Sequence, residues 1–238
     1  MAVVNPIIVA LDMRTAEEAV SVATAVAPHV GAFKVGLGLL HGPGPATIDA
    51  LVRLDKPVFA DAKLHDIPSQ VEAAAYRLGT HGARWVTAHI SGGASMLEAA
   101  VQGLQRGGGA AAVGVLGVSV LTSLGTADLE RVGIQRTPGQ LVGKMAKVAQ
   151  VAGCEGVVCS PHELHVVGQA APGILRVTPG IRTQETDDDQ TRTATPAEAV
   201  ARGADWIVVG RPITRADDPA RAAAVIAEAV HGTEPTSG

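Results

Sequence analysis

Charged residues gather at the end of one short apolar segment, in the motif DAKLHD, residues 61–66. Asp61 and Lys63 are two positions apart on an apparently extended segment, so their side chains should share one face, and Asp66 follows just past its end. Lys34, from the preceding apolar segment, adds a second ammonium group. A buried structural ion network is one interpretation, since charges are buried only when they are paired. Four charges at neighbouring strand ends favour the other interpretation, a catalytic site with perturbed pKa values.

A second pattern is a glycine close to an arginine after each of the last two apolar segments. The motifs are VTPGIR, residues 177–182, and VVGRPIT, residues 208–214. Glycine lets backbone N–H groups approach an anion, and arginine can bind a phosphate through two parallel hydrogen bonds. Either motif alone could be an ordinary turn. Together, after the two last strands of a barrel, they predict a phosphate site.

Other short motifs are weaker candidates. His162 and His165 in PHELH lack the spacing of the HExxH zinc motif, and we expect them to be surface histidines. The glycines at 107–109 and the segment 36–42 lack the P-loop and dinucleotide patterns, and we interpret both as turns. The polar segment 183–195 follows the seventh apolar run, and its length favours a lid or a binding loop.

Eight short apolar runs alternate with segments whose apolar residues recur at helical spacing. Strand and helix alternating in units of about thirty residues predict a single-domain α/β protein, a (β/α)8 TIM barrel with catalytic groups at the carboxyl ends of its strands. A doubly wound parallel sheet is the alternative. We expect the barrel to span residues 1–230 and residues 231–238 to form a flexible C-terminal tail. The predicted strands are 7–11, 32–36, 58–62, 85–89, 112–120, 156–159, 175–178 and 206–210.

Composition narrows the function further. Of the 238 residues 47 % are hydrophobic but only 2 % are aromatic, so small aliphatic side chains must form the core, and a disordered chain is excluded. The net charge of −4 and the few aromatic rings leave little to bind nucleic acid. No apolar run reaches the ~18–20 residues that span a bilayer, and the N-terminus lacks a signal pattern, so we expect a cytoplasmic protein without a membrane partner. Cys154 and Cys159 are expected to be buried, reduced thiols.

Taken together, the motifs resemble those of the orotidine 5′-monophosphate decarboxylase family. The most specific match is Asp-x-Lys-x-x-Asp-Ile-Pro, residues 61–68. The other matches cover nearly the whole chain in the order and spacing of bacterial members. They are IIVALD with Asp12, FKVGL with Lys34, TAHISGG at 87–93, SVLTS with Thr122, VTPGIR with Arg182, and VVGRPIT with Gly210 and Arg211.

The resemblance implies conversion of orotidine 5′-monophosphate to UMP and CO2, the last step of de novo pyrimidine nucleotide synthesis, without metal or cofactor. Loss of CO2 leaves a carbanion in the plane of the ring at C6, which the site must stabilise electrostatically. Lys63 would stabilise this charge and donate the proton that replaces CO2. Asp61 would lie near the substrate carboxylate and, with Asp66 and Lys34, would keep Lys63 charged.

The resemblance also implies how the substrate is held. Asp12 and Lys34 would bind the ribose hydroxyls, and Thr122 would contact the pyrimidine. The phosphate would be bound by Arg182, Gln190, Gly210 and Arg211, with Gln190 also near the base.

Members of this family are homodimers, and the resemblance implies that Asp66 and Ile67 reach into the neighbouring site. Ser69 and Gln70 stand where the family commonly has Asn and Thr. Ala62 and Leu64 also differ from the common pattern. The threonine replaced by Gln70 normally helps at the shared site. We therefore expect altered affinity there rather than lost chemistry.

Two other functions stay open at this point. Metal-dependent relatives act on sugar phosphates and carry a glutamate where this chain has Lys34, whose charge would repel Mg²⁺. A catalytically silent barrel that only binds a nucleotide would have no need for Lys63 and Asp61 at one point.

Overall fold

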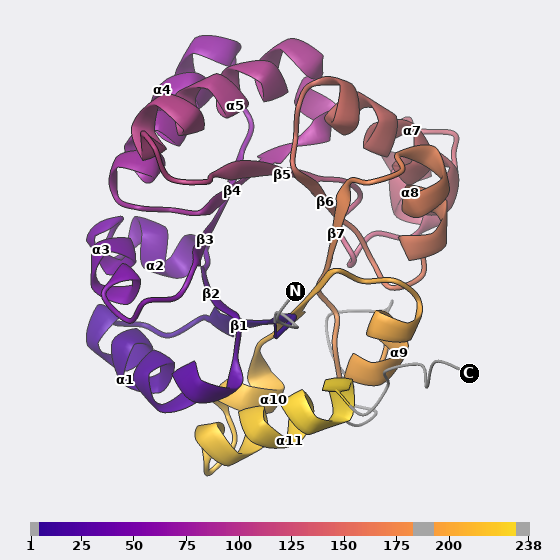
Figure 1. Cartoon of the computed structure of the whole chain (residues 1–238). Coiled ribbons are helices and arrows are strands. Elements are labelled where there is room, and N and C mark those ends of the chain that lie inside the picture. Colours follow the sequence, from indigo (N-terminus) through magenta and orange to yellow (C-terminus); the bar gives the residue numbers. More distant parts are fainter. Residues whose placement is uncertain (1–4, 183–192, 232–238) are drawn as a thin grey trace.

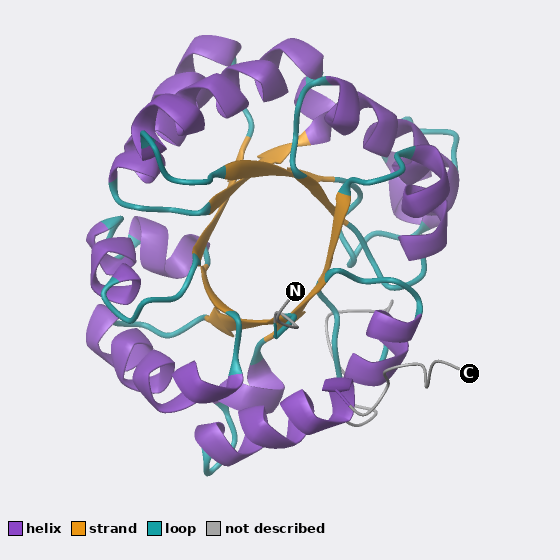
Figure 2. Ribbon diagram, viewed as in Figure 1, coloured by secondary structure: helices purple, strands orange, loops and turns teal. Residues whose placement is uncertain are grey.

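The computed structural model of the chain describes residues 5–182 and 193–231. Eight parallel strands close into a barrel, in which β1 pairs with both β2 and β8. Figure 1 looks into the barrel, and Figure 2 shows the strands as an inner ring with the helices outside it. The closed ring excludes the doubly wound sheet and confirms the predicted (β/α)8 barrel.

Seven of the eight strands begin where the sequence predicts, and three of these, β1, β4 and β7, also end there. The largest differences are in β5, which is shorter at both ends than the apolar run 112–120, and in β3, which continues two residues past the predicted Ala62. The strands are β1 Ile7–Leu11, β2 Ala32–Val35, β3 Val58–Leu64, β4 Trp85–His89, β5 Gly114–Val118, β6 Gly156–Val158, β7 Leu175–Thr178 and β8 Trp206–Val209.

Helices with an apolar face cover the outside of the barrel. Several begin at a threonine whose hydroxyl accepts a hydrogen bond from a backbone N–H group of the first turn, as Thr15, Thr137 and Thr195 do. The helices are α1 Ala16–Val26, α2 Leu37–His41, α3 Ala46–Val52, α4 Pro68–Thr80, α5 Ala94–Gly108, α6 Thr126–Arg131, α7 Pro138–Val151, α8 Leu164–Ala170, α9 Pro196–Ala201, α10 Arg211–Thr214 and α11 Pro219–His231, with short 3₁₀ turns at Ala27–His29 and Ile90–Gly92.

Strand alternation decides which side chains enter the barrel. One buried cluster fills the interior, whereas the intervening strand residues, such as Val9, Phe33 and Ala60, pack in the larger cluster with the helices. Because successive side chains point to opposite faces, residues two positions beyond an interior residue face the interior again. The interior cluster contains Ile8, Ala10, Ala32, Phe59, Trp85, Leu116, Val177 and Val208.

Two tryptophans pack together at the amino-terminal end of the barrel. Trp85 and Trp206 begin β4 and β8, and their rings meet edge to face with centroids 5.2 Å apart. The Trp85 indole donates a hydrogen bond to Glu155, which also receives one of 2.7 Å from Arg84. The core is thus mainly aliphatic, as predicted, and its two tryptophans close the end opposite the carboxyl ends of the strands.

Three other features predicted from the sequence are a C-terminal tail, two buried thiols and the lack of a membrane-spanning helix. Helix α11 ends at His231, and the rest of the predicted tail lies outside the described residues. Cys154 and Cys159 are free and buried, and burial raises the pKa of the Cys154 thiol to about 12. Among the described helices, none combines the length and the apolar character needed to cross a bilayer.

Candidate active site

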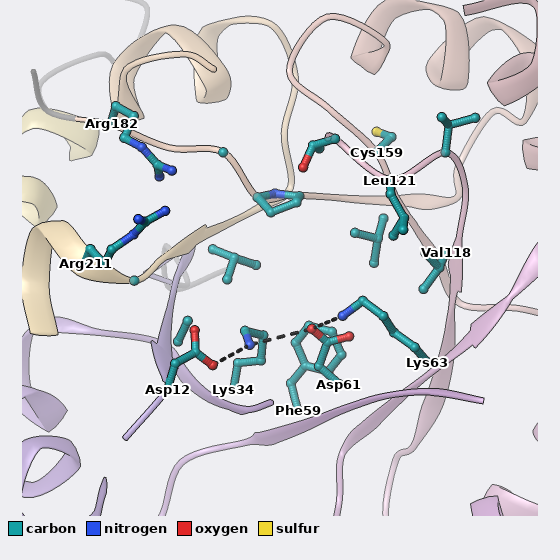
Figure 3. A pocket seen from close by; sticks show the side chains of 18 residues that line it. Asp12, Lys34, Phe59, Asp61, Lys63, Val118, Leu121, Cys159, Arg182 and Arg211 are labelled. Atoms are coloured by element: carbon teal, nitrogen blue, oxygen red, sulfur yellow. Dashed lines mark hydrogen bonds and ion pairs between the residues drawn. The ribbon is translucent and has the colours of Figure 1, made fainter. Parts of the chain in front are cut away.

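A cavity of about 240 Å³ opens at the carboxyl ends of the strands. Its floor is formed by interior residues of the barrel, including Ala10, Phe59 and Val208. Charged side chains lie along one side of it in Figure 3, and two arginines lie at one end. The predicted site residues that line it are Asp12, Lys34, Asp61, Lys63, Thr122, Arg182, Gly210 and Arg211.

Four of these side chains form a row of alternating charge, Asp12–Lys34–Asp61–Lys63, here called the charged row (Figure 3). Nζ of Lys63 lies 2.7 Å from Oδ2 of Asp61, which in turn lies 3.6 Å from Nζ of Lys34. Nζ of Lys34 is also 3.3 Å from Oδ1 of Asp12. Each charged group of the row therefore lies next to a group of opposite charge.

Strand register explains why Lys34 lies between two carboxylates. Its backbone pairs with Ala10 of β1 and with Phe59 of β3. Asp12 and Asp61 each follow two residues later, on the same face of their strands and one step closer to the cavity mouth. The long lysine side chain spans that step, and its ammonium group reaches both carboxylates.

Lys63 reaches the cavity through an irregularity in β3. The register with β4 shifts between Ala60 and Leu64, and Lys63 has a φ of +48°. This left-handed conformation is uncommon for a residue with a side chain and costs about 1–3 kcal/mol unless its surroundings hold it. Asp61 and Lys63 do both enter the cavity, but the expectation of a plain extended segment is wrong, because a bulge positions the lysine.

Electrostatics at the centre of the row favour an ionised carboxylate. Burial alone would raise the pKa of Asp61, whose side chain is only 13 % exposed. The ammonium groups of Lys34 and Lys63, with hydrogen bonds from Lys63 and Thr87, outweigh burial and hold this pKa below its usual 3.8. The Asp61 carboxylate is therefore charged at neutral pH beside the ammonium of Lys63.

The two arginines come from the last two βα connections. Arg182 follows Gly180, whose φ of +83° turns the chain after β7, and its Nη1 donates to the carbonyl of Ile181. Arg211 is the first residue of α10, directly after Gly210. In Figure 3 both guanidinium groups lie at the same end of the cavity, away from Lys63. Two guanidinium groups at one end of a cavity have the charge and the hydrogen-bond donors to bind a dianion such as a phosphate.

Known proteins are similar in sequence to this chain over almost its full length. The model of the "Orotidine 5'-phosphate decarboxylase / HUMPS family" matches residues 5–226. The chain belongs to this family. It is therefore an enzyme of the lyase class.

Individual family members agree with this assignment. Orotidine 5′-phosphate decarboxylase of Anaeromyxobacter dehalogenans is 51 % identical over 220 residues, which cover 92 % of this chain and 95 % of that protein. The enzyme of the same name from Paramagnetospirillum magneticum is 44 % identical over 225 residues, 92 % of this chain and 96 % of that one. The crystal structure of orotidine 5′-phosphate decarboxylase from Lactobacillus acidophilus superposes with a TM-score of 0.83 at 35 % identity, covering 94 % of this chain and 98 % of that chain.

Some residues that the family resemblance implies lie away from this cavity. Asp66, Ile67 and Gln70 are exposed on the rim, where the chain leaves β3 and begins α4. Asp66 accepts a 2.6 Å hydrogen bond from the backbone N–H of Ile67, and Ile67 is 62 % exposed. The expected meeting of Asp66 with the other three charges therefore does not occur within one chain. Gln190 lies outside the described residues.

One buried residue at this family site has no role in the sequence analysis. Thr87 of β4 is fully buried, and its hydroxyl touches both Asp61 and the backbone of Lys63. Two signals in the sequence point to it: it begins the TAHISGG motif, and it lies two positions after the interior residue Trp85. Thr87 could therefore have been predicted as a polar residue at an interior strand position near the charged row.

Proposed function

We propose that this chain converts orotidine 5′-monophosphate to UMP and CO2, the last step of de novo pyrimidine nucleotide synthesis. The observation that carries the proposal is the charged row, in which Nζ of Lys63 and the largely buried carboxylate of Asp61 lie 2.7 Å apart in the cavity. Relatives 44–51 % identical to the chain carry the name of this enzyme. A protein that only binds a nucleotide gains nothing from placing Lys63 and Asp61 side by side. A reaction that develops charge beside them does, because the pair can then stabilise the transition state more than the bound substrate.

The cavity suggests one orientation for the substrate. The phosphate lies between Arg182 and Arg211, with the backbone of Gly210 beside it. The ribose hydroxyls contact Asp12 and Lys34 at the near end of the charged row. The pyrimidine then extends toward Lys63 and lies against Thr122 and the apolar wall, which contains Val118, Val158, Leu121 and Pro179. We expect Gln190 to join the phosphate contacts.

The reaction follows from this orientation. The bond from C6 to the carboxylate breaks, CO2 leaves, and the electron pair stays on C6 in the plane of the ring. The ammonium of Lys63 stabilises this charge as it develops and then transfers a proton to C6. Asp61 lies beside the departing carboxylate, where its charge disfavours the bound substrate, and it orients the Lys63 ammonium.

Lys34 supports a reaction without metal or cofactor. Its Nζ lies within 3.6 Å of carboxylate oxygens of both Asp12 and Asp61, so it fills the position where a divalent cation would bind them. A dication there would be repelled by the ammonium group. This geometry argues against the sugar-phosphate branch, in which a glutamate replaces the lysine.

We further propose a homodimer in which each copy completes the other's site. Asp66 and Ile67 lie on the exposed rim where the chain leaves β3, and an isoleucine that is 62 % exposed is suited to burial by a partner. In the dimer Asp66 approaches the partner's Lys63 and helps to keep it charged. Gln70 lies one helical turn further on and adjusts affinity at the same shared site.

A direct assay separates these functions. The absorbance of orotidine 5′-monophosphate is followed with purified protein in EDTA, and UMP is identified as the product. Conversion that EDTA does not affect supports the proposal. Activity that requires Mg²⁺ and a sugar phosphate would assign the chain to the other branch, and UMP binding without turnover would make it a binding protein.

A further inference from the structure

We propose that Thr87 is a positioning residue for this reaction: its hydroxyl group connects the carboxylate of Asp61 to the backbone of Lys63 and so fixes the pair. The inference rests on the proposed function for its catalytic consequence. Its geometric part concerns three residues of two neighbouring strands and stands by itself.

The hydrogen bonds around Thr87 form a closed ring. The backbone N–H of Lys63 donates to Oγ1 of Thr87 at 2.9 Å, and the Thr87 hydroxyl donates to Oδ1 of Asp61 at 2.9 Å. Nζ of Lys63 then donates to Oδ2 of the same carboxylate at 2.7 Å. Lys63 is thus held at both its backbone and its ammonium group, and Thr87 supplies the connection on the backbone side.

The backbone of Lys63 needs such a support. Its φ of +48° lies in the left-handed region, and the ordinary pairing of β3 with β4 is interrupted there. The backbone N–H of Lys63 bonds to the Thr87 side chain in place of a strand carbonyl. A fully buried hydroxyl on strand β4 can hold this conformation, whereas water could hold it less precisely in position.

The same hydroxyl sets the direction of the Asp61 carboxylate. Because Thr87 occupies Oδ1, the other oxygen, Oδ2, is left facing both lysines, at 2.7 Å from Lys63 and 3.6 Å from Lys34. Rotation of the carboxylate would exchange these contacts. Thr87 therefore determines which oxygen the reacting ammonium meets.

Loss of the hydroxyl has a defined consequence for protonation. The Thr87 hydrogen bond is one of the contacts that lower the pKa of Asp61, beside the charges of Lys34 and Lys63. The other titratable groups near Asp61 are His89, from the same strand as Thr87, and Asp12, which shares Lys34 with it. A variant that removes only the hydroxyl should leave these groups in place and raise the pKa of Asp61.

The test compares Thr87→Val, which keeps the shape and removes the hydroxyl, with Thr87→Ser, which keeps the hydroxyl. Thr47→Val is the matched control, because Thr47 is also buried and its hydroxyl has no hydrogen-bond partner among the described residues. Thermal unfolding checks that each variant folds. If Thr87→Val does not fold, Thr87→Ala takes its place.

We expect Thr87→Val to lower kcat by about 10- to 100-fold, with a change in KM of less than about 3-fold, since small misplacements of reacting groups have effects of this size. Thr87→Ser should stay within about 5-fold of the wild type, and Thr47→Val should match it. The acidic limb of the kcat/KM profile should move to higher pH in Thr87→Val alone. A Thr87→Val enzyme with wild-type kcat, or a Thr87→Ser enzyme as slow as Thr87→Val, would overturn the proposal.

A second readout does not depend on activity. The carboxyl resonance of Asp61, assigned with an Asp61→Asn variant, is titrated by NMR in the wild type, Thr87→Val and Thr87→Ser. A higher pKa in Thr87→Val alone supports the positioning role even if orotidine 5′-monophosphate is not the substrate. An unchanged pKa contradicts the role, whatever the enzyme converts.

Discussion

Gly36 lies so close to Asp12 that a Cβ atom on this glycine would be 2.6 Å from Oδ1 of Asp12 and 3.2 Å from Nζ of Lys34. The φ of Gly36 is −87°, so its backbone is open to any residue. What excludes a side chain is the first ion pair of the charged row. Glycine at this position, between β2 and α2, leaves room for the ion pair of Asp12 and Lys34.

Gly36→Ala should therefore weaken substrate binding without unfolding the protein. The added methyl group displaces the Asp12 carboxylate, a contact worth about 1.5–3 kcal/mol when it binds a hydroxyl, so KM should rise about 10-fold or more. Gly38→Ala is the control, because a Cβ there meets nothing within 4 Å. The prediction fails if steady-state kinetics give both variants the same KM.

Arg211→Ala should lower kcat/KM by at least about 100-fold although Arg211 lies away from Lys63. Binding energy from an unreacting phosphate orders the site around the reacting group, so its loss affects the rate as well as the affinity. Arg215→Ala, one turn later and outside the cavity lining, is the matched control. Near-wild-type kcat/KM in Arg211→Ala would remove Arg211 from the phosphate site.

Gly103→Ala should destabilise the fold, although alanine favours helices. A Cβ atom on Gly103 of α5 would collide with the backbone carbonyl of Glu72 on α4, and backbone cannot swing aside as a side chain can. We expect a loss of about 1–3 kcal/mol in urea unfolding. Gly139→Ala in α7, where a Cβ meets nothing within 4 Å, should instead gain about 0.5–1 kcal/mol. Equal effects of the two substitutions would contradict the close approach of α4 and α5.

His89 should make stability depend on pH near neutrality. Burial, with the neighbouring His65 and Lys63, outweighs the opposing charge of Asp61 and holds the pKa of His89 below its usual 6.5. The unfolded chain then binds the proton more readily, so this contribution to stability is complete above about pH 6.5 and falls as the pH drops toward the lower native pKa. Asp61, whose pKa is also lowered, loses its contribution only below its usual pKa of 3.8.

The check is the free energy of unfolding in urea between about pH 7.5 and about pH 5.5. In His89→Gln the free energy of unfolding should decline less as the pH falls over this range. The exposed His165, replaced in the same way, should leave the decline as it is in the wild type. A His89→Gln protein with the full decline would show that other groups cause it.

Much of the fold could be predicted because it depends on patterns with short periods. Short apolar runs predicted strands close to their observed bounds, and strand β1 matched residue for residue. Side chains alternate between the two faces of each strand. The same alternation identifies the interior positions, so Asp12, Lys34 and Asp61 could be placed together at the carboxyl ends of their strands. Register between parallel strands then follows from closure of the barrel.

What could not be predicted depends on contacts between distant segments. The left-handed backbone of Lys63 arises from the interrupted pairing of β3 with β4 and from the Thr87 hydroxyl, 24 positions later. The position of Asp66 on an exposed rim depends on where α4 begins after the bulge. Charge and spacing alone placed Asp66 in the same cluster, because they carry no information about how the chain leaves the strand.

The role of Lys63 in the reaction is tested by the turnover of orotidine 5′-monophosphate by Lys63→Ala at saturating substrate in the presence of EDTA. Lys147→Ala, which removes an exposed lysine of α7, is the control. We predict that kcat of Lys63→Ala falls by about 10⁴-fold or more, since both the charge stabilisation and the proton donor are lost, while Lys147→Ala matches the wild type. Turnover by Lys63→Ala within about 10-fold of the wild type would contradict the account, because another group would then have to protonate C6.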